Sequence, residues 1–187
     1  TVIPSWCTLR GMPKLRCWNA CWSKGLGETA PRVAVDAHGR YHAFDLAREL
    51  YRKGNLARLT TTYPAFIARR FVPGSASLRT APALELWRRI HDRVALVPNP
   101  DPGLARAFAR FASRTLPDEC DLLVGWSAGI LEAIAPARER GIAVIVERGS
   151  THISHQAVTL AEEYRGFHLA PPATSPETIE RELAEYQ

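Results

Sequence analysis

Short apolar runs alternate with amphipathic stretches from Arg32 to the end of the chain. The runs are rich in Val, Ile and Leu and are bordered by turn residues, which is typical of strands buried on both faces of a parallel sheet. We predict strands over 32–37, 56–63, 121–126 and 142–147, with a further candidate at 75–80. Helical spacing predicts helices over 41–53, 83–92, 104–115, 128–140 and 152–166, with a last one starting after Ser175.

Alternating strands and helices predict an α/β fold with a Rossmann-like, doubly wound parallel sheet. Residues 31–187 are enough for one such domain. Residues 1–30 show no sustained helical or strand period and are predicted to be an N-terminal extension of unknown role.

Polar clusters follow three of the predicted strands, at 38–42, 125–129 and 147–152. The carboxyl ends of parallel strands meet at one edge of the sheet, where ligands bind in open α/β folds. Helix N-termini at that edge also present free N–H groups to anions. The sequence therefore predicts a functional site there.

The net charge of +5 comes mostly from residues 1–30, so no basic stripe points to nucleic acid. Cys7, Cys17 and Cys21 have no second thiol pair or paired histidine near them, so we expect no metal site and no disulfide framework. The first thirty residues contain no unbroken apolar segment of the signal-peptide type. These observations favour a cytoplasmic protein.

Gly125-Trp126-Ser127-Ala128-Gly129 fits the G-x-S-x-G pattern of a serine-hydrolase nucleophile elbow. No Asp follows Ser127, and the acid at the next strand end is Glu147, after which His152, His155 or His168 would have to complete the triad. The alternative is that Ser127 caps a helix while Ala128 and Gly129 allow close packing or ligand approach. A serine hydrolase with Ser127 as nucleophile therefore stays open as one hypothesis.

Four segments in order, 37–50, 121–134, 146–164 and 175–187, resemble the N-terminal half of retaining glycosyltransferases of family 4. The resemblance covers about 32–187. It implies one half of a GT-B fold, in which two Rossmann-like domains face a cleft. The intact enzyme would transfer a sugar from a nucleotide-sugar to a saccharide, lipid-linked or small-molecule acceptor with retention. A C-terminal, donor-binding half is not contained in this sequence, so the isolated chain is expected to be inactive.

The resemblance also implies roles for particular residues. His152 would lie near the transferred sugar and Glu147 would accept hydrogen bonds from its hydroxyls, which makes these two the catalytic candidates. Contacts to the acceptor and to the donor phosphates are expected from His38, Gly39, Arg40, His42, Ser127, Arg148, Gly149 and Ser150. The nucleotide-sugar is a co-substrate, and neither a metal nor another cofactor is expected.

Structural alternatives remain open for the same residues. Arg40 can be a surface residue on a tight turn, Glu147 can pair with an arginine, and Ser150 can cap the following helix. The whole domain can also be a non-catalytic nucleotide- or partner-binding module that self-associates through an exposed apolar face. Peripheral association with the inner face of the membrane is a further expectation for an enzyme with a lipid-linked acceptor.

Overall fold

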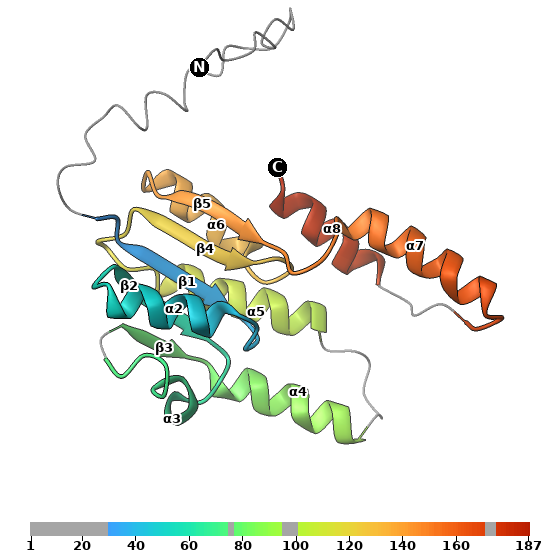
Figure 1. Cartoon of the computed structure of the whole chain (residues 1–187), viewed down its shortest axis with the longest axis horizontal. Helices are drawn as coiled ribbons and strands as arrows, with labels where there is room; N and C mark the ends of the chain where they lie inside the picture. The colour runs from blue at the N-terminus through green and yellow to red at the C-terminus, as the bar shows by residue number, and fades with distance from the viewer. Residues whose placement is uncertain (1–29, 75–76, 95–100, 171–174) are drawn as a thin grey trace, which may run out of the picture. The chain divides into compact units, whose positions relative to one another are not determined.

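The computed structural model describes residues 30–74, 77–94, 101–170 and 175–187. Five strands form one sheet in which every pairing is parallel, in the order β3-β2-β1-β4-β5 (Figure 1). The strands are β1 (Val33–Ala37), β2 (Leu56–Thr61), β3 (Leu78–Thr80), β4 (Leu122–Trp126) and β5 (Ala143–Glu147). The predicted α/β, Rossmann-like fold is confirmed. The predicted extension over 1–30, with Cys7, Cys17 and Cys21, lies outside the described residues apart from Ala30.

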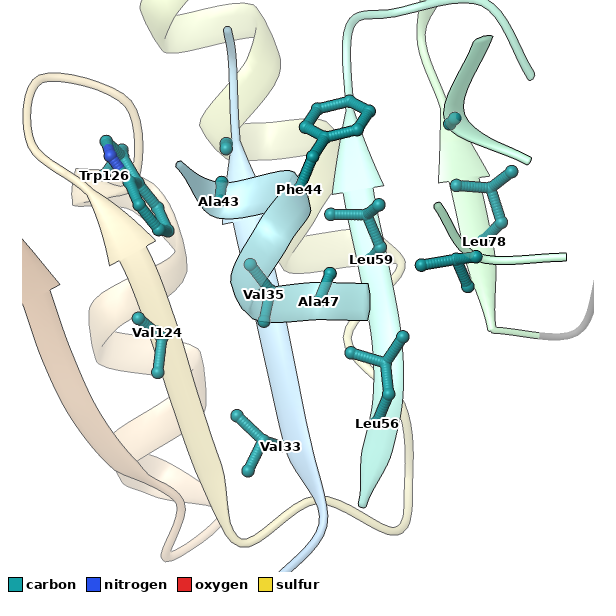
Figure 2. Packing of buried hydrophobic residues seen from close by; sticks show 13 residues of the cluster. Val33, Val35, Ala43, Phe44, Ala47, Leu56, Leu59, Leu78, Val124 and Trp126 are labelled. Atoms are coloured by element: carbon teal, nitrogen blue, oxygen red, sulfur yellow. The ribbon is translucent and has the colours of Figure 1, made fainter. Parts of the chain in front are cut away.

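Helices connect the strands and cover both faces of the sheet. They are α2 (Ala43–Arg52), α3 (Ala65–Ala68), α4 (Pro82–Val94), α5 (Asp101–Arg114), α6 (Leu131–Glu139), α7 (Ile153–Gly166) and α8 (Pro176–Glu185). On one face, Phe44 of α2 is fully buried against Val35 and Leu59 of the central strands (Figure 2). On the other face, Ala112 of α5 and Ala133 of α6 pack against the sheet. Small side chains let these helices approach the sheet closely.

A charged side chain lies within the sheet itself. Asp36 of β1 is 1% exposed, and its Oδ2 has no hydrogen-bond partner among the described residues. Burial raises the pKa of Asp36 from 3.8 to about 6, although a hydrogen bond from Thr60 and the charge of Arg58 act in the opposite direction. Desolvation therefore dominates at this position.

The structure corrects three predictions made from local patterns. β5 is an edge strand whose Ile145 is 48% exposed, so it is not buried on both faces. The helix predicted from Leu104 starts at Asp101 instead. The helix predicted from Ala128 starts at Leu131, because Ala128 adopts a left-handed backbone conformation with φ 66° that interrupts a helix. Ser127 consequently does not cap that helix, whose N-cap is Ile130.

The C-terminal helix α8 begins as its sequence predicts. Ser175 is its N-cap and accepts a hydrogen bond from the backbone N–H of Thr178, while Pro176 stands in the first turn. The helix packs against α6 and α7. Within the described residues, no helix combines the length and the apolar content needed to cross a bilayer.

Candidate functional site

A pocket of about 480 Å³ lies at the carboxyl edge of the sheet. Its walls come from the segments that follow β1, β4 and β5, and from α8. The residues that line it are His38, Tyr41, His42, Trp126, Ser127, Ala128, Arg148, Gly149, Ser150 and Glu182. The predicted convergence of the three polar segments at one edge is thus present in the structure.

The segment after β1 is fixed by contacts on both sides of His38. Its carbonyl oxygen accepts a 2.7 Å hydrogen bond from the Thr62 hydroxyl, which ties the loop to the end of β2. Its ring Nε2 lies 3.2 Å from the Tyr41 hydroxyl oxygen. A Cβ on Gly129 would stand 2.5 Å from His38 Nδ1, so only a glycine there leaves room for the ring. The second glycine of the G-x-S-x-G pattern therefore serves the placement of His38.

Two aromatic rings form one side of the pocket. Tyr41 and Trp126 stack with their ring planes 6° apart and their centroids separated by 6.4 Å. Trp126 lies beside the start of α2 (Figure 2) and is 4% exposed, and its indole nitrogen has no hydrogen-bond partner among the described residues. The edge of the His42 ring meets Trp126 at 5.1 Å between centroids. The exposed Tyr41 ring therefore gives this side of the pocket an aromatic surface, which suits a ligand with an apolar face.

A histidine and a carboxylate from distant segments meet at the rim. His42 Nε2 lies 3.3 Å from Glu147 Oε1, and both side chains keep substantial solvent exposure. The contact joins the start of α2 to the end of β5. A carboxylate on one ring nitrogen orients the imidazole, which leaves the other nitrogen for a ligand.

Arg148 is engaged by protein groups inside the pocket wall. Its guanidinium bonds the Glu182 carboxylate of α8 and the side-chain oxygen of Gln156. Glu182 also accepts a 3.1 Å hydrogen bond from the Tyr186 hydroxyl. Because the Arg148 and Glu182 side chains are only 13% and 7% exposed, this pair is a structural element of the wall.

The loop between β4 and α6 holds a carboxylate of the protein itself. Glu185 Oε2 accepts a hydrogen bond of 2.6 Å from the N–H of Ala128, and Oε1 accepts bonds of 3.0 Å from Ile130 and Leu131. Burial nevertheless raises the pKa of Glu185 above its ordinary value, while these N–H groups act to lower it. The predicted anion-binding helix start is real, but Glu185 occupies it.

The structure brings together six of the ten predicted site residues as pocket lining: His38, His42, Ser127, Arg148, Gly149 and Ser150. Glu147 touches His42 without lining the pocket. Arg40 lies over the Phe71 ring at 5.3 Å, and Gly39 packs under the Tyr41 ring. His152 is the N-cap of α7 and faces Tyr186 at 5.3 Å, so it too is outside the pocket lining.

Sequence reasoning missed Tyr41, Glu182 and Glu185 as parts of the site. Tyr41 is adjacent to the predicted cluster and was assigned only to a helix, whereas its φ of 35° keeps it in the loop. Glu182 and Glu185 lie on a helix whose docking position has no local sequence signal. Their spacing of three residues on one helix face was the only available hint.

The geometry gives little support to a hydrolase centred on Ser127. Its backbone N–H donates to the Glu147 carbonyl at 2.9 Å, and the left-handed residue is Ala128 rather than the serine, unlike a nucleophile elbow. No hydrogen bond joins the Ser127 hydroxyl to a histidine of the described chain. Across the same residues, no group of three or more His, Cys, Asp or Glu side chains is arranged to hold a metal ion.

Comparison with known proteins adds no family assignment. No protein-family description matches the chain, and no curated protein is significantly similar to it.

Proposed function

We propose that residues 31–187 form the acceptor-side domain of a retaining glycosyltransferase of the family 4, GT-B type. The observation that carries the proposal is the pocket of about 480 Å³ at the carboxyl edge of the parallel sheet, with aromatic and polar groups from three strand ends. Its volume lies in the range of small-molecule sites, which is about 300–1,000 Å³. The order of the four family-like segments along the chain adds support.

The lining suits a polyhydroxylated ring. Tyr41, which is exposed and stacks on Trp126, offers an apolar surface for the C–H face of a sugar. His38, His42 and the hydroxyls of Ser127 and Ser150 supply directional partners for sugar hydroxyls. This combination favours a saccharide over a purely apolar ligand.

The chemistry assigned to this half is mainly positioning. In retaining transfer without an enzyme-bound sugar, the leaving diphosphate of the donor takes the proton of the acceptor hydroxyl, so the protein orients the two substrates and stabilises charge. Glu147 orients the His42 imidazole, whose ring N–H can donate a hydrogen bond to an oxygen of the diphosphate. Arg148 holds the pocket wall through Glu182 and contributes no uncompensated positive charge.

The partners in this proposal are a nucleotide-sugar donor, a saccharide or lipid-linked acceptor, and a second, donor-binding half. Most of the donor is gripped by that second half, so sugar transfer by residues 1–187 alone is not expected. A peripheral position at the inner face of the membrane belongs to the same proposal, because a lipid-linked acceptor is presented there.

Saturation-transfer NMR on the 187-residue chain tests the proposal directly, with a panel of methyl hexosides and disaccharides and with UDP- and GDP-sugars as probes. We expect millimolar binding of at least one saccharide. Substituting His42→Ala should weaken it about tenfold, since one hydrogen bond to the saccharide is lost. His155→Ala is the matched control, because His155 is an exposed histidine on α7 outside the pocket lining.

The alternatives give different outcomes in the same experiments. If no saccharide binds to the folded chain, the glycosyltransferase proposal is wrong. If a p-nitrophenyl ester is hydrolysed and Ser127→Ala abolishes the hydrolysis, the serine-hydrolase hypothesis replaces it. Binding of nucleotide alone, unaffected by His42→Ala, would favour a non-catalytic nucleotide-binding module.

A further inference from the structure

Helix α4 turns its apolar face toward solvent, whereas an ordinary surface helix turns that face toward the core. Its apolar residues Leu86, Trp87 and Ile90 are 59%, 56% and 54% exposed, and Val94 is 48% exposed. The spacing of these residues puts them on one face of the helix. Surface helices normally bury such a face against the core, so the exposed stripe requires its own explanation.

The polar side of α4 is the one that faces the protein. Glu85 is 3% exposed and is the only residue of α4 that is fully buried. Its carboxylate accepts hydrogen bonds of 2.9 Å from Arg88 and 2.8 Å from Arg89. Both ion pairs lie within α4, at spacings of three and four residues, and they compensate the charge of the buried carboxylate.

The apolar stripe continues onto α3. Phe66 is 69% exposed, and a hollow of about 430 Å³ lies between the two helices. Its lining is almost entirely apolar and includes Pro64, Ile67, Pro82 and Leu86 beside Phe66. We call the surface made by Phe66, Leu86, Trp87, Ile90 and Val94 the α3–α4 face. Both helices lie at the β3 end of the sheet (Figure 1), and none of their residues lines the sugar pocket.

Positive charge is concentrated around this face. Residues 64–94 contain six arginines and two acidic residues, a net charge of +4, whereas residues 31–187 as a whole carry only +2. The remainder of the domain is therefore net negative. Arg69, Arg70 and Arg93 are exposed and form no ion pair with the described residues. Arg89 and Arg93 lie beside the apolar stripe on the helical wheel of α4.

We propose that the α3–α4 face docks on the surface of an anionic lipid bilayer. Trp, Phe, Leu and Ile flanked by arginines are the composition of a helix that lies in a membrane interface. Anionic headgroups complement the arginines, while the apolar side chains enter the boundary of the acyl chains. A second copy of the chain fits less well, because pairing two such faces would bring like charges together. This inference rests on the proposed function in so far as that function places the domain at a membrane, and it names the face that attaches the domain there; none of the residues of the α3–α4 face lines the pocket.

Vesicle co-sedimentation tests the docking without any sugar, so its result does not depend on the proposed function. The 187-residue chain is mixed with vesicles of phosphatidylcholine alone or with about 30% phosphatidylglycerol added. We expect binding to the anionic vesicles that weakens with increasing salt. Replacing three exposed arginines in Arg69→Gln/Arg70→Gln/Arg93→Gln should weaken binding to anionic vesicles at least tenfold. Removing apolar side chains in Leu86→Ser/Ile90→Ser should weaken binding by about the same factor.

Matched controls separate the face from overall charge and hydrophobicity. Lys53→Gln/Arg138→Gln/Arg165→Gln removes the same amount of exposed charge elsewhere. Val158→Ser/Leu169→Ser removes apolar side chains that are 56% and 60% exposed. Both controls should bind like the original chain. Failure to bind anionic vesicles, or equal losses in variants and controls, overturns the proposal. So does a dimer in analytical ultracentrifugation that Leu86→Ser/Ile90→Ser dissociates, because the face would then join two copies.

Discussion

Replacing Asp36 with Asn should change how the stability of this domain depends on pH. Asp36 is fully buried in β1, and burial raises its pKa from 3.8 to about 6. At pH values below 3.8 the carboxyl is protonated in the folded and the unfolded chain. As pH rises from there to about 6, the unfolded chain releases the proton and the folded chain still holds it, so the folded state loses stability.

The magnitude follows from the same two values. The interval from 3.8 to about 6, at about 1.4 kcal/mol per pH unit, corresponds to about 3 kcal/mol of unfolding free energy lost by pH 7.5. Asn cannot ionise, so Asp36→Asn removes this loss whatever constant offset the amide itself introduces. Part of this loss has already occurred at pH 4, so the variant should gain about 2.5 kcal/mol relative to the original chain between pH 4 and pH 7.5.

Urea unfolding at half-unit pH steps from 4 to 8, followed by circular dichroism, measures the difference between the two stability curves. Asp118→Asn serves as a control, since the Asp118 side chain is fully exposed and its replacement should change stability by less than about 0.5 kcal/mol at every pH. A difference curve for Asp36→Asn that is flat, or that falls with rising pH, would refute the assignment of desolvation as the dominant effect at Asp36.

Three further substitutions probe the site and its support. Glu185→Ala removes the acceptor of three backbone N–H groups at the start of α6 and should lower the unfolding free energy by about 3 kcal/mol in urea titrations; an unchanged midpoint would contradict this capping role. Ser175→Ala removes the bond from Thr178 N–H and should cost about 1 kcal/mol, seen as a lower melting temperature. Gly129→Ala places a methyl group against His38 and should weaken saccharide binding about tenfold, while retained affinity would show that His38 can move freely.

The sequence was sufficient to predict the sheet because parallel strands leave a strong local signal. The runs at β1, β4 and β5 are mostly apolar, and each is followed by a segment with polar residues that the sheet then brings to one edge. The convergence of His38, Ser127 and Arg148 on one pocket follows from that topology alone. A polar residue that directly follows a predicted parallel strand can therefore be placed at the carboxyl edge of the sheet from the sequence alone.

Other features depend on contacts between distant parts of the chain, which local spacing does not reveal. The apolar pattern of β5 matches that of an interior strand, and only the strand order shows that it is an edge. His152 belongs to the right loop, but its place as the N-cap of α7 directs it to Tyr186. The docking of α8 was equally invisible, because Glu182 and Glu185 look like ordinary solvent-facing residues of an amphipathic helix.

Glu182 and Glu185 connect two separate rims of the pocket to the same helix, α8. Glu182 holds Arg148 on the segment after β5, and Glu185, one turn further along, holds the segment after β4. Neither segment can swing outward unless the helix moves with it or one of these bonds breaks. By reciprocity, a ligand that draws the two rims together also strengthens the attachment of α8. A displacement of that helix in turn changes the affinity of the pocket for the ligand.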